Sequence, residues 1–222
     1  MADQTRPQVI AIEEHYLDDV VDEYTGRHGG GTPPIREKLA DLGEVRLREM
    51  DSAGVDIQVL SHCPPGAQAF APDDAAQLAR GVNDRLNDVV LGNPERFQAF
   101  ATLPTQDPAA AADELSRCVN EMGFKGAMIH GQTAGQFHDE DQFWPIFERA
   151  AALDVPIYIH PGFPNREVID LYYGKYKEMY PPIVQAGWGF TVETATAGIR
   201  LVLSGLFDKY PNLKIILGHL GE

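Results

Sequence analysis

The stretch VIAIEEH, residues 9–15, begins as an apolar run and ends in two acids and a histidine. A short apolar run of this kind is typical of a strand buried in a parallel sheet. Because strand side chains alternate between faces, we expect Glu13 and His15 to project to the same side. The end of a single strand therefore offers a carboxylate and an imidazole together.

Four later runs also end in a histidine, namely DIQVLSH (56–62), KGAMIH (125–130), VPIYIH (155–160) and KIILGH (214–219). Histidines placed at the carboxyl ends of successive strands predict an active site ringed by strand ends, as in a β/α barrel. Imidazole is also the commonest metal ligand in proteins. The spacing therefore favours a metal centre at the ends of the strands.

Strand and helix signals alternate along the whole chain. We expect strands at 8–15, 56–62, 97–103, 125–130, 155–160 and 213–218, and helices at 44–53, 73–91, 107–122, 140–153 and 191–209. Asp107 followed by Pro108 is typical of a helix start, and Gly54 and Gly123 lie where helices end. We expect a mobile Gly/Pro-rich loop at 24–36 within a single domain covering 1–222.

Two α/β architectures fit this alternation, an open doubly wound sheet and a closed (β/α)8 barrel of the TIM type. A doubly wound nucleotide-binding protein usually carries a glycine fingerprint after its first strand, and here that strand ends in Glu-Glu-His. The barrel is therefore favoured. A complete barrel usually needs about 250 residues. About six of its eight βα units fit before the final GHLGE (218–222), so we expect the chain to be incomplete at its C-terminus.

Composition limits the possible partners. The formal net charge is −15, which argues against binding to nucleic acid or to an anionic membrane surface. Cys63 and Cys118 do not form a disulfide framework, and a reduced, cytoplasmic protein is expected. No apolar run approaches the roughly 20 residues of a membrane-spanning helix, and the N-terminus does not resemble a signal peptide. A small anionic substrate is still compatible, since a bound metal can dominate the local field.

Each candidate residue also has a plain structural interpretation. Glu13 and His15 could be solvated residues of an edge strand, and His160 could be a buried histidine held by a hydrogen bond. His219 and Glu222 could be a helix start with an acid in its first turn, although a glutamate three residues after a histidine can also orient it. The other histidines favour the metal site for Glu13 and His15, and the strand end with its following HPGFP turn (160–164) favours a ligand at His160. For His219 and Glu222 both interpretations can hold at once.

Other histidines carry weaker signals. His130 is expected to face the pocket and contact substrate, whereas His62 is equally well explained as a loop residue. His28 and His138 are expected to be exposed loop residues. His28 opens a His-Gly-Gly-Gly stretch like an esterase oxyanion loop, but the sequence has no GxSxG nucleophile motif. Cys63 is better explained as a buried thiol than as a nucleophile.

Several segments together resemble the amidohydrolase superfamily. They are EEH (13–15), LREMDSAGVDIQVLS (47–61), FWPIFERAAALDVPIYIHP (143–161) and LFDKYPNLKIILGHLGE (206–222). They are most similar to its branch of metal-dependent, non-oxidative decarboxylases, which includes the aminocarboxymuconate semialdehyde, γ-resorcylate, dihydroxybenzoate and 5-carboxyvanillate decarboxylases. The resemblance runs from residue 9 to the end of the sequence.

The resemblance implies a distorted barrel with one divalent ion, Zn²⁺ or Mn²⁺. Glu13 and His15 match the ligands on the first strand, where other members carry H-x-H, and His160 matches the ligand on the fifth. His219 matches a catalytic histidine, and Glu222 matches its hydrogen-bonded partner. His130, the candidate substrate-binding residue, stands where several aromatic-acid decarboxylases have asparagine. The family's last ligand, an aspartate on the eighth strand, has no counterpart in this sequence.

Three functions therefore remain open. The first is a carboxy-lyase that removes CO2 from a small hydroxylated aromatic or related unsaturated acid. The second is a hydrolase in which a metal-bound hydroxide attacks a lactone, ester or amide. The third is an inactive chain that binds metal weakly or assembles with partners. The resemblance also implies a possible homodimer.

Overall fold

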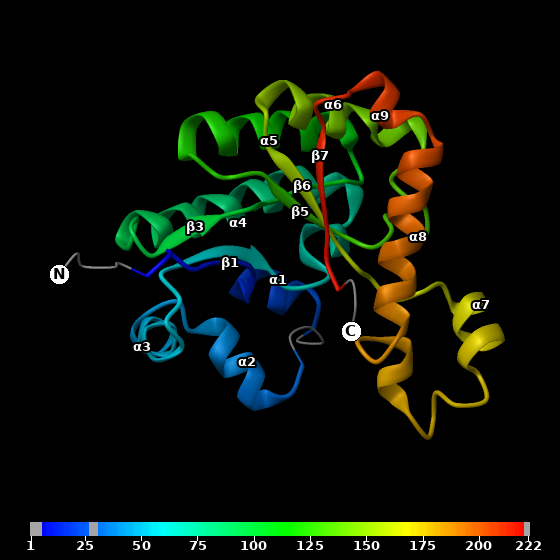
Figure 1. Cartoon of the computed structure of the whole chain (residues 1–222), viewed down its shortest axis with the longest axis horizontal. Coiled ribbons are helices and arrows are strands. Elements are labelled where there is room, and N and C mark those ends of the chain that lie inside the picture. Colours follow the sequence, from blue (N-terminus) through cyan, green and yellow to red (C-terminus); the bar gives the residue numbers. More distant parts are fainter. Residues whose placement is uncertain (1–5, 27–30, 220–222) are drawn as a thin grey trace.

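The computed structural model describes residues 6–26 and 31–219, and it shows parallel strands whose outer face is covered by helices (Figure 1). The strands are β1 (Ile10–Tyr16), β2 (Ile57–His62), β3 (Phe97–Ala99), β4 (Ala101–Thr102), β5 (Ala127–His130), β6 (Pro156–His160) and β7 (Lys214–Leu217). They form two sheets, ordered β1-β2-β3 and β4-β5-β6-β7, in which every paired strand runs parallel.

The two sheets follow one another in chain order and are separated by an interruption at Phe100, between β3 and β4. The amide of Phe100 donates to Leu60 O of β2, and the amide of Ala101 donates to Gly126 O beside β5. The predicted strand 97–103 is therefore present as β3 and β4, which turn the sheet from one neighbour to the next. The predicted partial (β/α)8 barrel is confirmed, with parallel strands at all six predicted positions in the described residues.

The helices occupy most of the predicted ranges. They are α1 (Asp19–Tyr24), α2 (Pro33–Ala40), α3 (Glu44–Ala53), α4 (Pro72–Gly92), α5 (Pro108–Met122), α6 (Trp144–Leu153), α7 (Arg166–Val168), α8 (Gly189–Leu203) and α9 (Leu206–Lys209). The side chain of Asp107 accepts from the amide of Ala110, so it caps α5 as predicted. Gly54 and Gly123 end α3 and α5 in the left-handed conformation, also as predicted.

Some elements differ from the prediction. The expected helix 191–209 is two helices, α8 and α9, because Gly205 adopts a left-handed conformation between them. The expected loop 24–36 holds the end of α1 and the start of α2, and residues 27–30, including His28, lie outside the described residues. None of the described helices is long and apolar enough to cross a membrane.

Of the three buried apolar clusters among the described residues, two flank the strands as an outer and an inner layer. The outer layer packs the helices against the strands, with Leu60, Leu115, Phe147 and Ile157 all fully buried. Figure 1 shows α4, α5 and α6 lying together over the strands on this side. The inner layer is smaller and consists of Val59, Phe100, Met128 and Tyr158, with Ile216 packed against it. The strand ends that follow these inner residues carry the predicted site.

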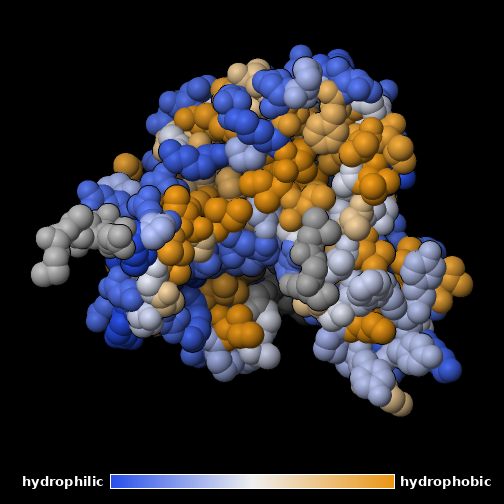
Figure 2. Space-filling model, viewed as in Figure 1, coloured by the Kyte–Doolittle hydropathy of each residue, from blue (hydrophilic) through white to orange (hydrophobic). Residues whose placement is uncertain are grey.

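An apolar groove runs between α8 and β7. It is lined by Ile199, Val202, Ile215 and Leu217 among others, and Ile199 and Val202 are largely exposed. Figure 2 shows apolar side chains gathered over β7 and α8 on the face in view.

His138 was expected to be exposed, and this prediction is wrong, because its side chain is only 3% exposed. Its Nε2 lies 2.9 Å from Thr133 Oγ1, and its ring packs on Phe143. Burial lowers the pKa of His138 from 6.5 to about 4. Between these two values the unfolded chain binds a proton that the folded chain does not, so stability falls as the pH drops through this window.

We expect His138→Gln to reduce this acid sensitivity, because glutamine keeps a polar group at the site but does not titrate. A fully buried histidine contributes up to about 1.4 kcal/mol of lost stability per pH unit inside the window. The free energy of unfolding in urea at about pH 7, 6 and 5 measures the slope for wild type and variant. Equal slopes would show that His138 titrates normally in the folded protein.

Candidate metal centre

Three side chains converge at the carboxyl ends of the strands. Glu13 of β1, His160 of β6 and His219 after β7 each offer one ligand atom, and these atoms all lie within 4.8 Å of one another. Glu13 Oε1 lies 3.5 Å from His160 Nε2 and 3.0 Å from His219 Nε2. The two imidazole Nε2 atoms are 3.1 Å apart. We refer to these three residues as the strand-end cluster.

These separations suit a divalent ion. Ligand atoms about 2.1 Å from an ion stand about 3.0 Å apart at a right angle and about 3.4 Å apart at the tetrahedral angle. The contacts within the cluster cover this range. A donor set of one carboxylate oxygen and imidazole nitrogens is the mixed N/O chemistry that Zn²⁺ and Mn²⁺ accept. The residues of the cluster therefore fit the group that the sequence predicts.

The ring of His160 is oriented by its own backbone. Its Nδ1 lies 2.7 Å from Pro161 O, which places the hydrogen on Nδ1 and leaves the Nε2 lone pair directed into the cluster. Burial, and then the neighbouring His15, lowers the pKa of His160 to about 3. The imidazole is consequently neutral near pH 7, which is the form that binds a metal.

His219 reaches the cluster through an unusual backbone conformation. Its φ is +54°, in the left-handed region that side-chain-bearing residues rarely adopt. The hydroxyl of Thr191, on α8, donates to His219 O and helps to hold this turn. Strain of this kind is typical of residues whose position matters for function. Glu222, the predicted partner of His219, lies outside the described residues.

His15 lies beside the cluster. Its ring centroid is 4.8 Å from that of His160, and its Nδ1 is 3.2 Å from Ser61 Oγ. Burial lowers the pKa of His15 to about 4 although Glu13 opposes the shift. Of the predicted ligands Glu13, His15 and His160, the structure brings the first and third together with His219. It places His15 in ring contact with His160.

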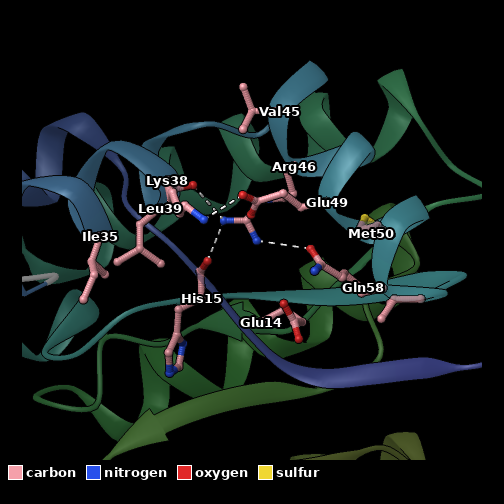
Figure 3. A pocket seen from close by; sticks show the side chains of 12 residues that line it. Glu14, His15, Ile35, Lys38, Leu39, Val45, Arg46, Glu49, Met50 and Gln58 are labelled. Carbon is pink, nitrogen blue, oxygen red and sulfur yellow. Dashed lines mark hydrogen bonds and ion pairs between the residues drawn. The ribbon is translucent and has the colours of Figure 1, made fainter.

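The backbone of His15 is held from the other face of β1. A second pocket lies on that face, and Arg46 is part of its lining. Figure 3 shows Arg46 reaching the main-chain oxygen of His15, while the imidazole of His15 points away from this second pocket. The distance from Arg46 Nη2 to His15 O is 2.8 Å, and Nη1 donates to Gln58 Oε1. Glu14 also lines this pocket, so successive residues of β1 serve opposite faces.

His130 lies next to the cluster, at the end of β5. It pairs in register with His160, and the two ring centroids are 5.2 Å apart. The side-chain amide of Gln68 hydrogen-bonds both backbone groups of His130: the His130 amide donates to Gln68 Oε1, and Gln68 Nε2 donates to His130 O. His130 Nδ1 is buried without a hydrogen-bond partner among the described residues. Burial, and then His160, lowers its pKa well below the usual range.

A cavity of about 370 Å³ opens beside His130. Its walls include Gln68, Gln132 and Asn165, which offer amide groups, and Phe163, which offers an aromatic face. Phe163 also packs on Phe190, whose ring lies 5.5 Å from that of His219. Ring contacts through His130 and Phe190 therefore link the lining of the cavity to the strand-end cluster, and a ligand in the cavity would contact both amide and aromatic groups.

His62 does not join the cluster. It is 2% exposed, its Nε2 accepts from the amide of Asp18, and its Nδ1 donates to Cys63 O. These contacts connect the end of β2 to the turn after β1, so the His62 side chain stabilises the backbone rather than the cluster. Cys63 is buried as expected, and burial raises its pKa to about 12, which makes it a poor nucleophile.

Three residues at the site were missed from the sequence. Thr191 and Gln68 lie on helical segments that carry no motif. Tyr158, whose hydroxyl donates to Glu13 Oε2, lies two residues before His160. The alternation of strand side chains places Tyr158 and His160 on the same face, so this one contact was within reach of the sequence.

Comparison with known proteins identifies relatives of this chain. The amidohydrolase family model matches residues 10–222. A γ-resorcylate decarboxylase of Polaromonas sp. strain JS666 is 41% identical and covers 96% of this chain and 67% of its own length. A 2-amino-3-carboxymuconate-6-semialdehyde decarboxylase of Dictyostelium discoideum is 34% identical over 80% of this chain and 47% of its own.

Solved structures of decarboxylases are also similar to this chain. A dihydroxybenzoic acid decarboxylase from Polaromonas, crystallised with manganese and the inhibitor 2-nitroresorcinol, superposes with a TM-score of 0.83 at 38% identity, over 95% of this chain and 64% of its own. A 5-carboxyvanillate decarboxylase from Sphingomonas paucimobilis gives 0.83 at 34% identity, over 94% and 66%. The chain spans about two thirds of the length of the γ-resorcylate decarboxylases it matches. By the family match and these identities, the chain belongs to the amidohydrolase family.

Proposed function

We propose that this chain carries the metal-binding part of a non-oxidative decarboxylase that acts on a small hydroxylated aromatic or related unsaturated carboxylic acid. The observation that carries the proposal is the strand-end cluster, together with a nearby open cavity that has amide and aromatic walls. The similarity to several decarboxylases of hydroxylated aromatic acids supports it. Manganese in the structure of the Polaromonas dihydroxybenzoic acid decarboxylase favours Mn²⁺ over Zn²⁺ as the ion.

Glu13, His15 and His160 are the proposed ligands. Glu13 and His160 already face each other in the strand-end cluster. The Ser61 hydroxyl lies against Nδ1 of His15, so Nε2 is the nitrogen left for coordination. When bound, a divalent ion supplies Lewis acidity and a template for the substrate carboxylate and a neighbouring hydroxyl. Every other role belongs to side chains of the chain itself.

His219 is the proposed catalytic residue. Its side chain is 15% exposed, against 4% for His160, and its Nε2 lies 3.0 Å from Glu13 Oε1. Decarboxylation of an aromatic acid needs a proton at the ring carbon that carries the carboxylate, and loss of CO2 then returns the bonding electrons to the ring. A histidine at the mouth of the cluster is placed to take part in this proton supply, with Glu222 as its partner.

His130 is the proposed substrate contact. Gln68 fixes its main chain, and His130 lines the cavity in which the substrate would lie. Gln132 and Asn165 extend the polar wall of the same cavity, while Phe163 supplies an apolar face for a ring. The combination suits a planar ring that carries both a carboxylate and a hydroxyl.

The homodimer and the cytoplasmic location are also proposals. Large apolar side chains of the segment after β6 are exposed, among them Leu171, Tyr172, Met179 and Trp188, and a second copy of the chain would cover them. Both cysteines are free and buried, which supports a reducing compartment.

The ligand assignment is tested by variants at the two histidines that compete for the third position. We expect His15→Asn and His160→Asn to weaken Mn²⁺ binding more than about 100-fold, because each removes a ligand. We expect His219→Asn to keep most of the Mn²⁺ affinity and to lose turnover. Isothermal titration of purified protein with Mn²⁺ measures the affinities. The reverse order for His15 and His219 would make His219 the ligand and remove His15.

The reaction is tested by its product. We expect the Mn²⁺-loaded chain to release CO2 from 2,6-dihydroxybenzoate-type acids, and the His160→Asn variant to release none. The alternative hydrolase would instead form a new carboxylate from a lactone, ester or amide. Trapping of labelled CO2 and titration of released acid distinguish the two. Acid release from a lactone without CO2 from any hydroxybenzoate would replace the proposed function by the hydrolase.

A further inference from the structure

Tyr158 is the polar member of the inner core layer. The other described members, Val59, Phe100 and Met128, with Ile216 beside them, are apolar. Tyr158 pairs in register with Met128 on one side and with Ile216 on the other, and it is 3% exposed. A buried tyrosine usually needs a partner for its hydroxyl, and the apolar layer offers none.

The partner is the carboxylate of Glu13, on a strand that does not pair with β6. The Tyr158 hydroxyl donates to Glu13 Oε2. The other oxygen, Oε1, is the one that lies 3.0 Å from His219 Nε2 and 3.5 Å from His160 Nε2. The two oxygens of Glu13 therefore have different partners. Oε2 accepts a hydrogen bond from the phenol, and Oε1 faces the other members of the cluster.

Gly218 makes room for this contact. A Cβ at residue 218 would lie 2.8 Å from Tyr158 Cε1 and 3.0 Å from its hydroxyl oxygen, closer than real Cβ atoms come to such neighbours. The amide of Gly218 also donates to Ile159 O, so its backbone cannot easily move away. The glycine before His219 thus has a spatial reason: the phenol passes beside it to reach Glu13.

We propose that Tyr158 is a positioning residue, which holds Glu13 by Oε2 so that Oε1 alone is presented to a divalent ion. The inference rests on the proposed metal centre and holds whichever histidine is the third ligand. A carboxylate free to turn can bind an ion through either oxygen or both. The phenol removes that freedom, and partners of this kind are worth about 10–100-fold in metal affinity.

The test compares two tyrosines that each lose only a hydroxyl. We expect Tyr158→Phe to weaken Mn²⁺ binding by about 10–100-fold. Tyr16→Phe is the matched control, because Tyr16 is also buried, on β1, and its hydroxyl has no hydrogen-bond partner among the described residues. Titration of the purified chain with Mn²⁺, read by the electron spin resonance of the free ion, gives both affinities independently of turnover.

Each outcome decides the matter. Weaker binding in Tyr158→Phe, with wild-type affinity in Tyr16→Phe, supports the inference. Equal affinity in wild type and Tyr158→Phe, or equal losses in both variants, overturns it while the proposed function stands on its own CO2 assay. A wild-type chain that binds no Mn²⁺ overturns both the inference and the metal centre beneath it.

Gly218→Ala tests the spatial part separately. We expect it to weaken Mn²⁺ binding, because the new methyl group displaces the phenol from Glu13. If the glycine acts through that hydroxyl, adding Gly218→Ala to Tyr158→Phe should cost less than it costs in the wild type. Fully multiplicative losses would show that Gly218 acts on His219 directly and would remove it from the proposal.

Discussion

The carboxylate of Glu13 is the point on which the strand-end site depends. It lies on β1, yet its contacts are with Tyr158 and His160 of β6 and with His219 after β7. Neither β6 nor β7 pairs with β1 in the described sheets. One side chain therefore joins the first strand to the last two across the interior. A partly buried carboxyl group is tolerable in this position because a phenol and two imidazoles contact it.

Most of the strand framework could be predicted, because five strand ends carry a histidine and each preceding run is apolar. The helix boundaries at Asp107, Gly54 and Gly123 followed from capping chemistry that acts within a few residues. The break of the third strand at Phe100 could not be predicted. It depends on hydrogen bonds to Leu60 and Gly126, which come from two different neighbours far along the chain. Local pattern carries no signal for such a change of partner.

The site itself was predictable in its members more than in its geometry. Alternation along β1 places Glu13 and His15 on one face, and both lie at the site. The register of β1 against β2 shifts between Ala11 and Glu14, a stretch that includes Glu13, and no residue there signals this bulge in the sequence. His138 misled the prediction because its loop folds back and buries it against Phe143. Burial of a loop histidine is a tertiary outcome that composition cannot show.

The glycines after β5 and β6 carry a different lesson. A Cβ on Gly131 would lie 2.6 Å from the backbone of Gly162, and Gly131 N donates to His160 O at 2.7 Å. The backbone segments at Gly131 and Gly162 touch there without side chains between them, which keeps His130 and His160 close together. This close contact limits which positions can change when the fold adapts to a new substrate. Exchange at Gln132, Phe163 or Asn165 can reshape the cavity one side chain at a time, whereas an exchange at Gly131 must first move the backbone after both strands, next to the imidazoles they carry.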